Sequence, residues 1–479
     1  MKLRSTNPRA LARALVRTLA RWIAISAAGT ALAFGQDQDA ATLREEAQAA
    51  FERAALHGAE GRYQRARAGF RRVVTRYPDT PAAREAQKRL AGNDLFSFGD
   101  LVRHGPSDAR IDVLVLGDGY TLEQQDAFDD VAHDLPRLFE RSLVFGAYYP
   151  YFNFLRGNVI SSESGIDGYG RDASTALGGR ALEHANVPHA VVDHGRVRDV
   201  LARIPESEGL ALVVVQRGEG GTGGDGVATV GGRSFDRVLH VFGHAFADLG
   251  DEFADDQGFR HRVGTTRVNV SLVDDETRVP WSHWIEAGTP GVGTYEGAAG
   301  QVRGLWRPRA SGCIMNDGER FFCEPCREAI VLAIYERLDP ILFFGTQDRA
   351  LGVEDRIVLR EPLEIRAELL QPTTHGLEAR WYAVPEIDAP PFRAETRPRS
   401  RRGPLAPIEV EPLAVQKRVR NGEARLKLLP WRLEPGPYRL VLRVTDPARP
   451  AAHASRERWV LKDDRQLLHA ERAFRFLVE

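Results

Sequence analysis

Cysteine and methionine are scarce in this 479-residue sequence, and its net charge is close to zero. It contains three cysteines and two methionines. A chain with so few cysteines is not a small scaffold held together by disulfides. The net charge is −1, and residues 1–33 hold six basic residues and no acidic one, so the remaining chain carries −7. Because an acidic chain lacks the basic surface that nucleic acids require, they are excluded as partners.

The sequence also lacks an apolar run long enough to span a membrane. An apolar stretch from Trp22 to Ala33 follows the basic N-terminus and ends in a small-x-small pattern. This arrangement predicts a signal peptide over residues 1–33, cleaved near Ala33, and therefore a periplasmic or secreted protein without a membrane span in the mature chain. An uncleaved N-terminal anchor and an organellar transit peptide are the alternatives.

Residues 41–92 show helical spacing of apolar residues, with a break at Gly58 and Gly61 that predicts two helices. The stretch from Gly61 to Phe70, together with Tyr77-Pro78-Asp79 and Ala86, resembles a tetratricopeptide hairpin. Only one repeat is visible. We therefore expect a helical spacer that docks on the next domain or on another protein, rather than a peptide-binding groove.

The centre of the chain has the pattern of an α/β (α+β) domain. Residues 111–116 and 211–215 are short apolar runs that predict buried strands. Thr121 and Gln124 have the spacing of a capping box, which predicts the start of a helix. The glycine-rich stretch 218–226 lacks the ending of a phosphate-binding loop, so we expect a flexible loop there.

After residue 351 the helical pattern is replaced by alternation, as in residues 438–444. The segment 351–479 is therefore predicted to be an antiparallel β-sandwich domain. Residues 390–407 are rich in Pro and Arg, which predicts a mobile loop between its strands.

The sharpest chemical feature is the sequence His240-Val241-Phe242-Gly243-His244. Two histidines four residues apart lie on one face of a helix, so both imidazoles can reach one Zn²⁺ ion. Gly250 is expected to end that helix and turn the chain back. An acidic residue, Glu252 or its neighbour Asp251, would then complete a three-ligand site with an open position.

The segment from about residue 110 to 340 resembles the IgA peptidases, the metallopeptidase family M64. Matching motifs occur in order along it: residues 116–121 with Phe128, 153–154, 161–167, 218–226, the histidine helix 234–248, 281–285, 295–298, 306–308, 313–315 and 322–327. The resemblance implies a zincin-type metallopeptidase domain over residues 105–345. It also implies a polypeptide substrate or protein ligand, and zinc bound by His240, His244 and Glu252, with Asp251 as the alternative third ligand.

The family pattern is His-Glu-x-x-His, whereas this chain has Val241 at the second position. That glutamate acts as the general base on the zinc-bound water, and valine cannot transfer a proton. Loss of a positioned general base costs about 10²–10⁴ in rate. Glu163 and Glu296 are the carboxylates that we consider as substitutes.

Four further residues lie downstream of the histidine helix. Met315 is a candidate for the turn that metzincins place under the zinc site, and a core methionine is the alternative. Cys313, Cys323 and Cys326 predict one local disulfide with one cysteine left over. Three thiolates of a structural zinc site are the alternative, although the sequence shows no fourth ligand.

These observations leave three hypotheses for function. The first is an exported zinc-binding metallopeptidase homologue that has lost most or all of its activity and acts as a binding module. The second is an active secreted zinc endopeptidase with a relocated carboxylate. The third is a metal-free structural or protein-binding surface protein.

Overall fold

A computed structural model describes residues 36–479, except 169, 185–186, 205–206, 208, 233, 255–265, 317–319, 390–404, 420 and 450–457. The predicted signal peptide 1–33 and most of the Pro- and Arg-rich segment 390–407 lie outside the described residues. The chain divides into two compact units. One comprises residues 1–103, 112–138 and 153–246, and the other comprises residues 104–111, 139–152 and 247–479.

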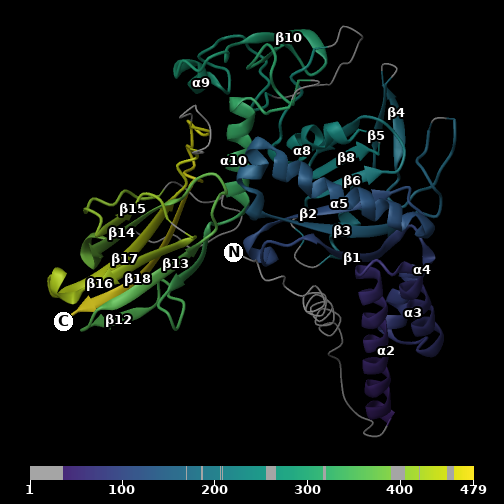
Figure 1. Cartoon of the computed structure of the whole chain (residues 1–479), viewed down its shortest axis with the longest axis horizontal. Coiled ribbons are helices and arrows are strands. Elements are labelled where there is room, and N and C mark those ends of the chain that lie inside the picture. Colours follow the sequence, from purple (N-terminus) through teal and green to yellow (C-terminus); the bar gives the residue numbers. More distant parts are fainter. Residues whose placement is uncertain are drawn as a thin grey trace. The chain divides into compact units, whose positions relative to one another are not determined.

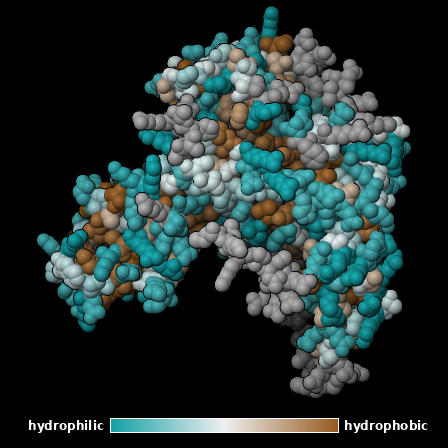
Figure 2. Space-filling view, in the orientation of Figure 1, coloured by the Kyte–Doolittle hydropathy of each residue, from teal (hydrophilic) through white to brown (hydrophobic). Residues whose placement is uncertain are grey.

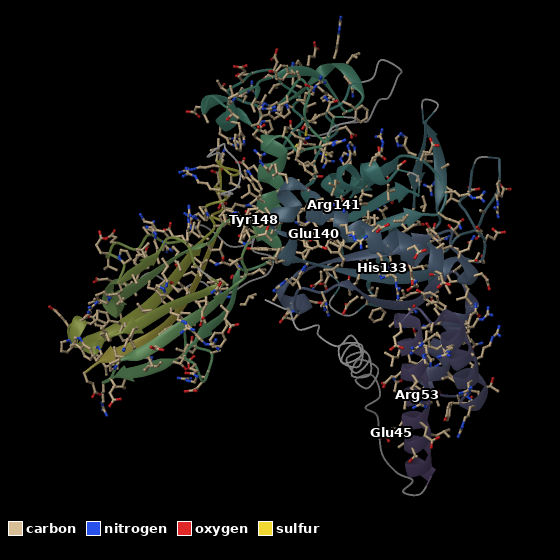
Figure 3. All side chains as sticks on the ribbon, viewed as in Figure 1. Glu45, Arg53, His133, Glu140, Arg141 and Tyr148 are labelled. Atoms are coloured by element: carbon tan, nitrogen blue, oxygen red, sulfur yellow. The ribbon has the colours of Figure 1, made fainter. Side chains whose placement is uncertain are left out.

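The first unit begins with three helices, α2 (Gln36–Ala59), α3 (Tyr63–Arg76) and α4 (Pro81–Ala91). The predicted break at Gly61 is present, because this glycine has a φ of 76° that few other residues adopt. The third helix was not predicted as a separate element, although Pro81 at its first turn and the Thr80 cap are ordinary start signals. Figure 3 shows Glu45 and Arg53 on α2, where both side chains are exposed.

The inner faces of these helices pack on the sheet of the same unit. Phe51 and Phe70 share an apolar cluster with Phe96 of strand β1 (Asp94–Val102). The Phe70 and Phe96 rings meet edge to face, with centroids 5.5 Å apart. The helical segment is therefore docked on its neighbour in the chain.

A six-stranded sheet forms the centre of the first unit, in the order β1-β3-β2-β6-β8-β7. Its remaining strands are β2 (Ile111–Asp118), β3 (Phe152–Ile160), β6 (Ala211–Val215), β7 (Gly221–Gly224) and β8 (Val227–Gly231). β2, β6 and β8 are parallel to one another, whereas β1 and β7 pair antiparallel at the two edges. Every residue of β2 and β6 is buried, as the two apolar runs predicted. The α/β character of this region is confirmed.

Helix α5 (Gln125–Arg141) lies across one face of this sheet (Figure 1). A single 3₁₀ turn (Leu122–Gln124) precedes it, and Thr121 and Gln124 form the predicted capping box. Phe128 of α5 contacts β2 at Gly117, where a Cβ atom would lie 2.7 Å from the ring. The remaining elements are α7 (His194–Leu201), the hairpin β4 (Arg180–His184) and β5 (Val187–Val191), and α8 (Val238–Ala247).

The second unit combines short helices, a small hairpin and two larger sheets. Its helices are α6 (Leu143–Ala147), α9 (Ser282–Glu286) and α10 (Glu324–Arg337), and its hairpin is β9 (Tyr295–Ala298) and β10 (Gln301–Arg307). One larger sheet contains β11 (Ile341–Gly345), β13 (Leu363–Leu369) and β16 (Glu423–Leu428). The other has the order β12 (Arg356–Leu359), β18 (His469–Val478), β17 (Gly436–Thr445), β14 (Glu378–Pro385) and β15 (Ala414–Gln416).

Both larger sheets contribute to one apolar cluster, which includes Ile365 and Leu426 from the first and Trp381 and Phe474 from the second. Most strand pairs are antiparallel, but β12 runs parallel to β18, which the alternating pattern did not predict. Apolar residues also reach the surface of these sheets in small patches between hydrophilic ones (Figure 2). No helix of the described residues has the length and apolar character needed to cross a bilayer.

Candidate metal centre

Helix α8 carries the histidine pair and packs against the glycine-rich edge strand β7. A Cβ atom on Gly223 would lie 2.1 Å from the carbonyl oxygen of Val241 and 2.8 Å from the Cβ of His244. A Cβ atom on Gly221 would lie 2.9 Å from the side chain of Val241. Only glycine permits so close an approach. The expectation of a flexible loop over residues 218–226 was therefore wrong for residues 221–224, which form strand β7. Glycine is rare in strands, so the sequence has the pattern of a loop, but here the close packing of α8 on the strand backbone requires glycine.

The two histidines point their Nε2 atoms at one another. These atoms are 3.1 Å apart, and the ring planes are inclined by 82°. Two nitrogen ligands at about 2.0–2.1 Å from a tetrahedral zinc ion would be separated by about 3.3 Å. His240 is buried and His244 is partly exposed, so the pair lies where a ligand from solvent can approach one side of it.

The chain turns directly after α8. Asp248 has a left-handed backbone with a φ of 53°, so the turn occurs two residues before Gly250, which was expected to make it. Asp tolerates this conformation better than most residues. Gly250 has another function, since a Cβ atom there would lie 2.7 Å from the side chain of Val270.

Asp251, rather than Glu252, joins the histidines. Potential ligand atoms of His240, His244 and Asp251 all lie within 4.8 Å of one another. The main chain of Asp251 is held by a hydrogen bond from the amide of Ala299 to its carbonyl oxygen, at 2.9 Å. Two histidines and one carboxylate are a ligand set that suits zinc, and such a set leaves a fourth position for water or substrate.

Glu252 is fully buried among the three cysteines. Its Oε1 atom lies 3.4 Å from the sulfur of Cys313, 3.4 Å from that of Cys323 and 3.0 Å from that of Cys326. Burial raises the pKa of this carboxyl well above its usual range, and the negative charge of Cys313 raises it further. None of the three cysteines is in a disulfide in the structure, and the Cys313 and Cys326 sulfurs are 3.8 Å apart. The predicted local disulfide is absent, because a disulfide needs its two sulfurs about 2.0 Å apart.

Asn269 connects the turn to this cluster, and the sequence did not single it out. Its side chain accepts a hydrogen bond from the Gly250 amide at 2.7 Å and donates to the Gly250 carbonyl at 2.8 Å. It also donates to Glu252 Oε1 at 3.0 Å. Asn269 begins the sequence Asn269-Val270-Ser271, which is formally a glycosylation sequon. The side chain is fully buried.

Val241 is buried where α8 packs on β7. Neither Glu163 nor Glu296, the candidate replacements for the missing glutamate, belongs to the ligand group of the two histidines. Glu163 is exposed and accepts a hydrogen bond from the Ser174 amide at 2.5 Å. Glu296 is also exposed and accepts one from the Gly304 amide at 3.1 Å. Within the part of the chain that the structure describes, Asp251 is the one carboxylate in the histidine group.

Met315 is fully buried, and its carbonyl oxygen accepts a hydrogen bond from the Glu252 amide at 2.7 Å. Its main chain therefore fixes the residue that follows Asp251. This contact does not involve the methionine side chain, so the turn under the zinc site and the core methionine both stay predictions.

Comparison with known proteins gives one family match, which covers this region. Residues 100–291, which include the histidine pair and Asp251, match the family model described as IgA Peptidase M64. The resemblance inferred from the sequence motifs is confirmed over these residues. No curated protein matches the chain.

Proposed function

We propose that this chain is an exported zinc-binding metallopeptidase homologue with impaired or absent catalysis, which the match of residues 100–291 to the family model IgA Peptidase M64 supports. The metallopeptidase family itself implies a polypeptide as the substrate or ligand. One observation carries the proposal: the histidine nitrogens converge as for a shared metal, while Val241 stands where the family has its catalytic glutamate.

The ligand set proposed for zinc is His240, His244 and Asp251, with Asp251 replacing Glu252 as the preferred carboxylate. The Nε2 separation of 3.1 Å and the ligand atoms within 4.8 Å support it. Zinc bound there would polarise a substrate carbonyl and lower the pKa of a bound water to about 7. The residues of the chain would hold the ion and leave one position open.

Proton transfer is the step that this chain lacks. A peptidase needs a base that takes the proton from the attacking water and passes it to the leaving amine. Val241 has no titratable group and is 1% exposed, packed on β7. Glu163 accepts a hydrogen bond from the amide of Ser174, and Glu296 of β9 accepts one from the amide of Gly304 of β10. We therefore expect polypeptides to be bound and hydrolysed slowly or not at all.

The other parts of the chain fit an exported binding module. Residues 1–33 would direct export, and N-terminal sequencing of the mature protein tests cleavage near Ala33. The edge strand β7 packs beside the histidine helix α8, which supports the zincin-type domain that we propose. The two C-terminal sheets that share one apolar core would be a β-sandwich domain that supplies further contacts.

Replacement of Val241 tests the proposal directly. Val241→Glu restores a carboxylate beside the metal and should raise hydrolysis of an unstructured polypeptide by about 10²–10⁴. Val241→Gln is the matched control, because it has nearly the same size and cannot act as a base. Zinc content is measured for both variants, for the wild type and for the His240→Ala/His244→Ala double variant.

Two outcomes would overturn the proposal. Efficient zinc-dependent hydrolysis by the wild type, abolished by Asp251→Ala, would show an active enzyme with a base elsewhere. Equal zinc content in the wild type and the double histidine variant would show that the histidines hold no metal. A gain with Val241→Glu and none with Val241→Gln supports impairment by the loss of one carboxylate.

A further inference from the structure

A second candidate metal site lies in the second unit and shares no ligand with the histidine group. It consists of Cys313, Cys323 and Cys326 with Glu252, whose potential ligand atoms all lie within 4.8 Å of one another. Glu252, Cys313 and Cys326 are fully buried, and Cys323 is 3% exposed. We propose that these four residues bind one Zn²⁺ ion in a closed, structural site.

The distances match a tetrahedral ion rather than a disulfide. With zinc–sulfur bonds of about 2.3 Å, two sulfur ligands are about 3.8 Å apart, and a sulfur and an oxygen ligand are about 3.6 Å apart. The Cys313 and Cys326 sulfurs are 3.8 Å apart. The distances from Glu252 Oε1 to the Cys313 and Cys323 sulfurs, 3.4 Å each, are close to the sulfur–oxygen value, and the distance to the Cys326 sulfur is shorter, at 3.0 Å.

Within the described part of the chain, one polar atom of the cluster also lacks a protein partner. Four potential ligand side chains are buried together, and a buried polar group without a partner is costly. Arg307 interacts electrostatically with Glu252, but its guanidinium donates to the carbonyl oxygens of Gly297, Arg309 and Ala310. Among the described residues, no hydrogen-bond partner reaches Glu252 Oε2. A divalent ion would bind the lone pairs of these ligand atoms and would give the Glu252 carboxylate the partner that it lacks among the described protein groups.

The surrounding main chain holds the ligands in place. The amide of Cys323 donates to the Cys313 sulfur at 3.3 Å. Cys326 lies in the first turn of α10, which brings its sulfur beside those of Cys313 and Cys323. Asn269 donates to the ligating oxygen of Glu252 and would orient it, as residues behind metal ligands commonly do.

Four closed ligands leave no position for water, so this zinc ion would stabilise the fold and would not catalyse. It would join the segment after α8 to the start of α10. Since Asp251 precedes Glu252, an ion on Glu252 would also restrict Asp251, which connects the structural site to the ligand set of the proposed function.

The test uses the full chain with the histidine ligands removed, so that it does not depend on the proposed function. The His240→Ala/His244→Ala variant should retain about one equivalent of zinc after purification without chelators. X-ray absorption at the zinc edge should show three sulfur ligands at about 2.3 Å and one oxygen ligand at about 2.0–2.2 Å. This measurement needs no cysteine replacement, so it does not depend on whether such variants fold.

Replacement of the ligands provides the second arm. In the double-histidine background, Cys326→Ser should remove the remaining zinc, and Glu252→Gln should lower its affinity at least tenfold. Glu286→Gln is the matched control, because Glu286 is an exposed carboxylate of the same unit. Three results would each overturn the site: no zinc in the double-histidine variant, zinc without sulfur ligands, or a disulfide found by alkylation of the unreduced, denatured protein.

Discussion

At the scale of single residues, the Asp118 carboxylate organises the loop between β3 and β4. It is fully buried at the end of β2 and accepts hydrogen bonds from the Thr175 hydroxyl and from the amides of Leu177 and Gly179, at 2.7–2.9 Å. Asp118→Ala would leave the Leu177 amide unpaired and would remove an acceptor from the Thr175 hydroxyl and the Gly179 amide, so we expect a loss of about 2–4 kcal/mol in unfolding free energy. Calorimetry measures it, with Asp172→Ala, an exposed aspartate of the same loop, as the control. Equal effects of the two variants would contradict the role of Asp118.

Residue-scale prediction succeeded where the chemistry is local and stopped where it depends on distant partners. The i, i+4 spacing of His240 and His244 is enough to bring them together on α8. The choice between Asp251 and Glu252 is different, because neighbouring side chains point in different directions. Glu252 turns toward cysteines that lie more than 60 residues further along the chain, and the sequence alone does not show which carboxylate they receive.

At the scale of elements, the contact between β7 and α8 positions the histidines. Gly223→Ala places a Cβ atom against the Val241 carbonyl and His244, so β7 or α8 must shift. Because His244 is a proposed ligand, we expect zinc affinity to fall about 10–100-fold, as for other changes behind metal ligands. Competition with a chelator measures this affinity. Gly224→Ala is the control, since nothing lies within 4 Å of its Cβ position, and a similar loss in both variants would refute the argument.

An element could be predicted from the sequence where its pattern is set by local structure and burial. β2 and β6 are buried on both faces, so their sequences are uninterrupted apolar runs, and the capping box at Thr121 and Gln124 is a local signal. β7 is different, because its glycines are required by the approach of α8 and have the pattern of a loop. The parallel pairing of β12 with β18 joins segments more than 100 residues apart, which alternation within a strand does not encode.

At the scale of the whole molecule, the compact units are not continuous in sequence. The second unit takes residues 139–152 from the middle of the first unit's sequence. Tyr148 from this segment, Tyr335 from α10 and His375 from the loop before β14 all donate to Asp446, which follows β17, at 2.6–2.8 Å (Tyr148 is labelled in Figure 3). The buried carboxylate therefore holds together segments that are almost 300 residues apart, which no local pattern could predict.

This network makes the stability of the second unit depend on pH. Burial alone would raise the pKa of Asp446. The hydrogen bond and charge of His375, and the hydrogen bonds from the Tyr335 hydroxyl and the Ala448 amide, outweigh burial and hold this pKa below its usual value. A lowered carboxyl pKa stabilises the fold above the unfolded value of about 3.9, and this contribution is lost as the pH falls through the folded pKa. Asp446→Asn should cost about 2–4 kcal/mol at neutral pH, because it replaces a buried carboxylate that accepts several hydrogen bonds with a neutral amide.

The difference in unfolding free energy between the wild type and Asp446→Asn should shrink as the pH falls below about 4, because protonated aspartate carries no charge, like asparagine. Unfolding in urea at a series of pH values measures this difference. Asp464→Asn is the control, since the Asp464 side chain is 74% exposed, and it should change stability little at any pH. A constant difference between the wild type and Asp446→Asn across this range would mean that the ionised carboxylate contributes nothing to the contact between these distant segments.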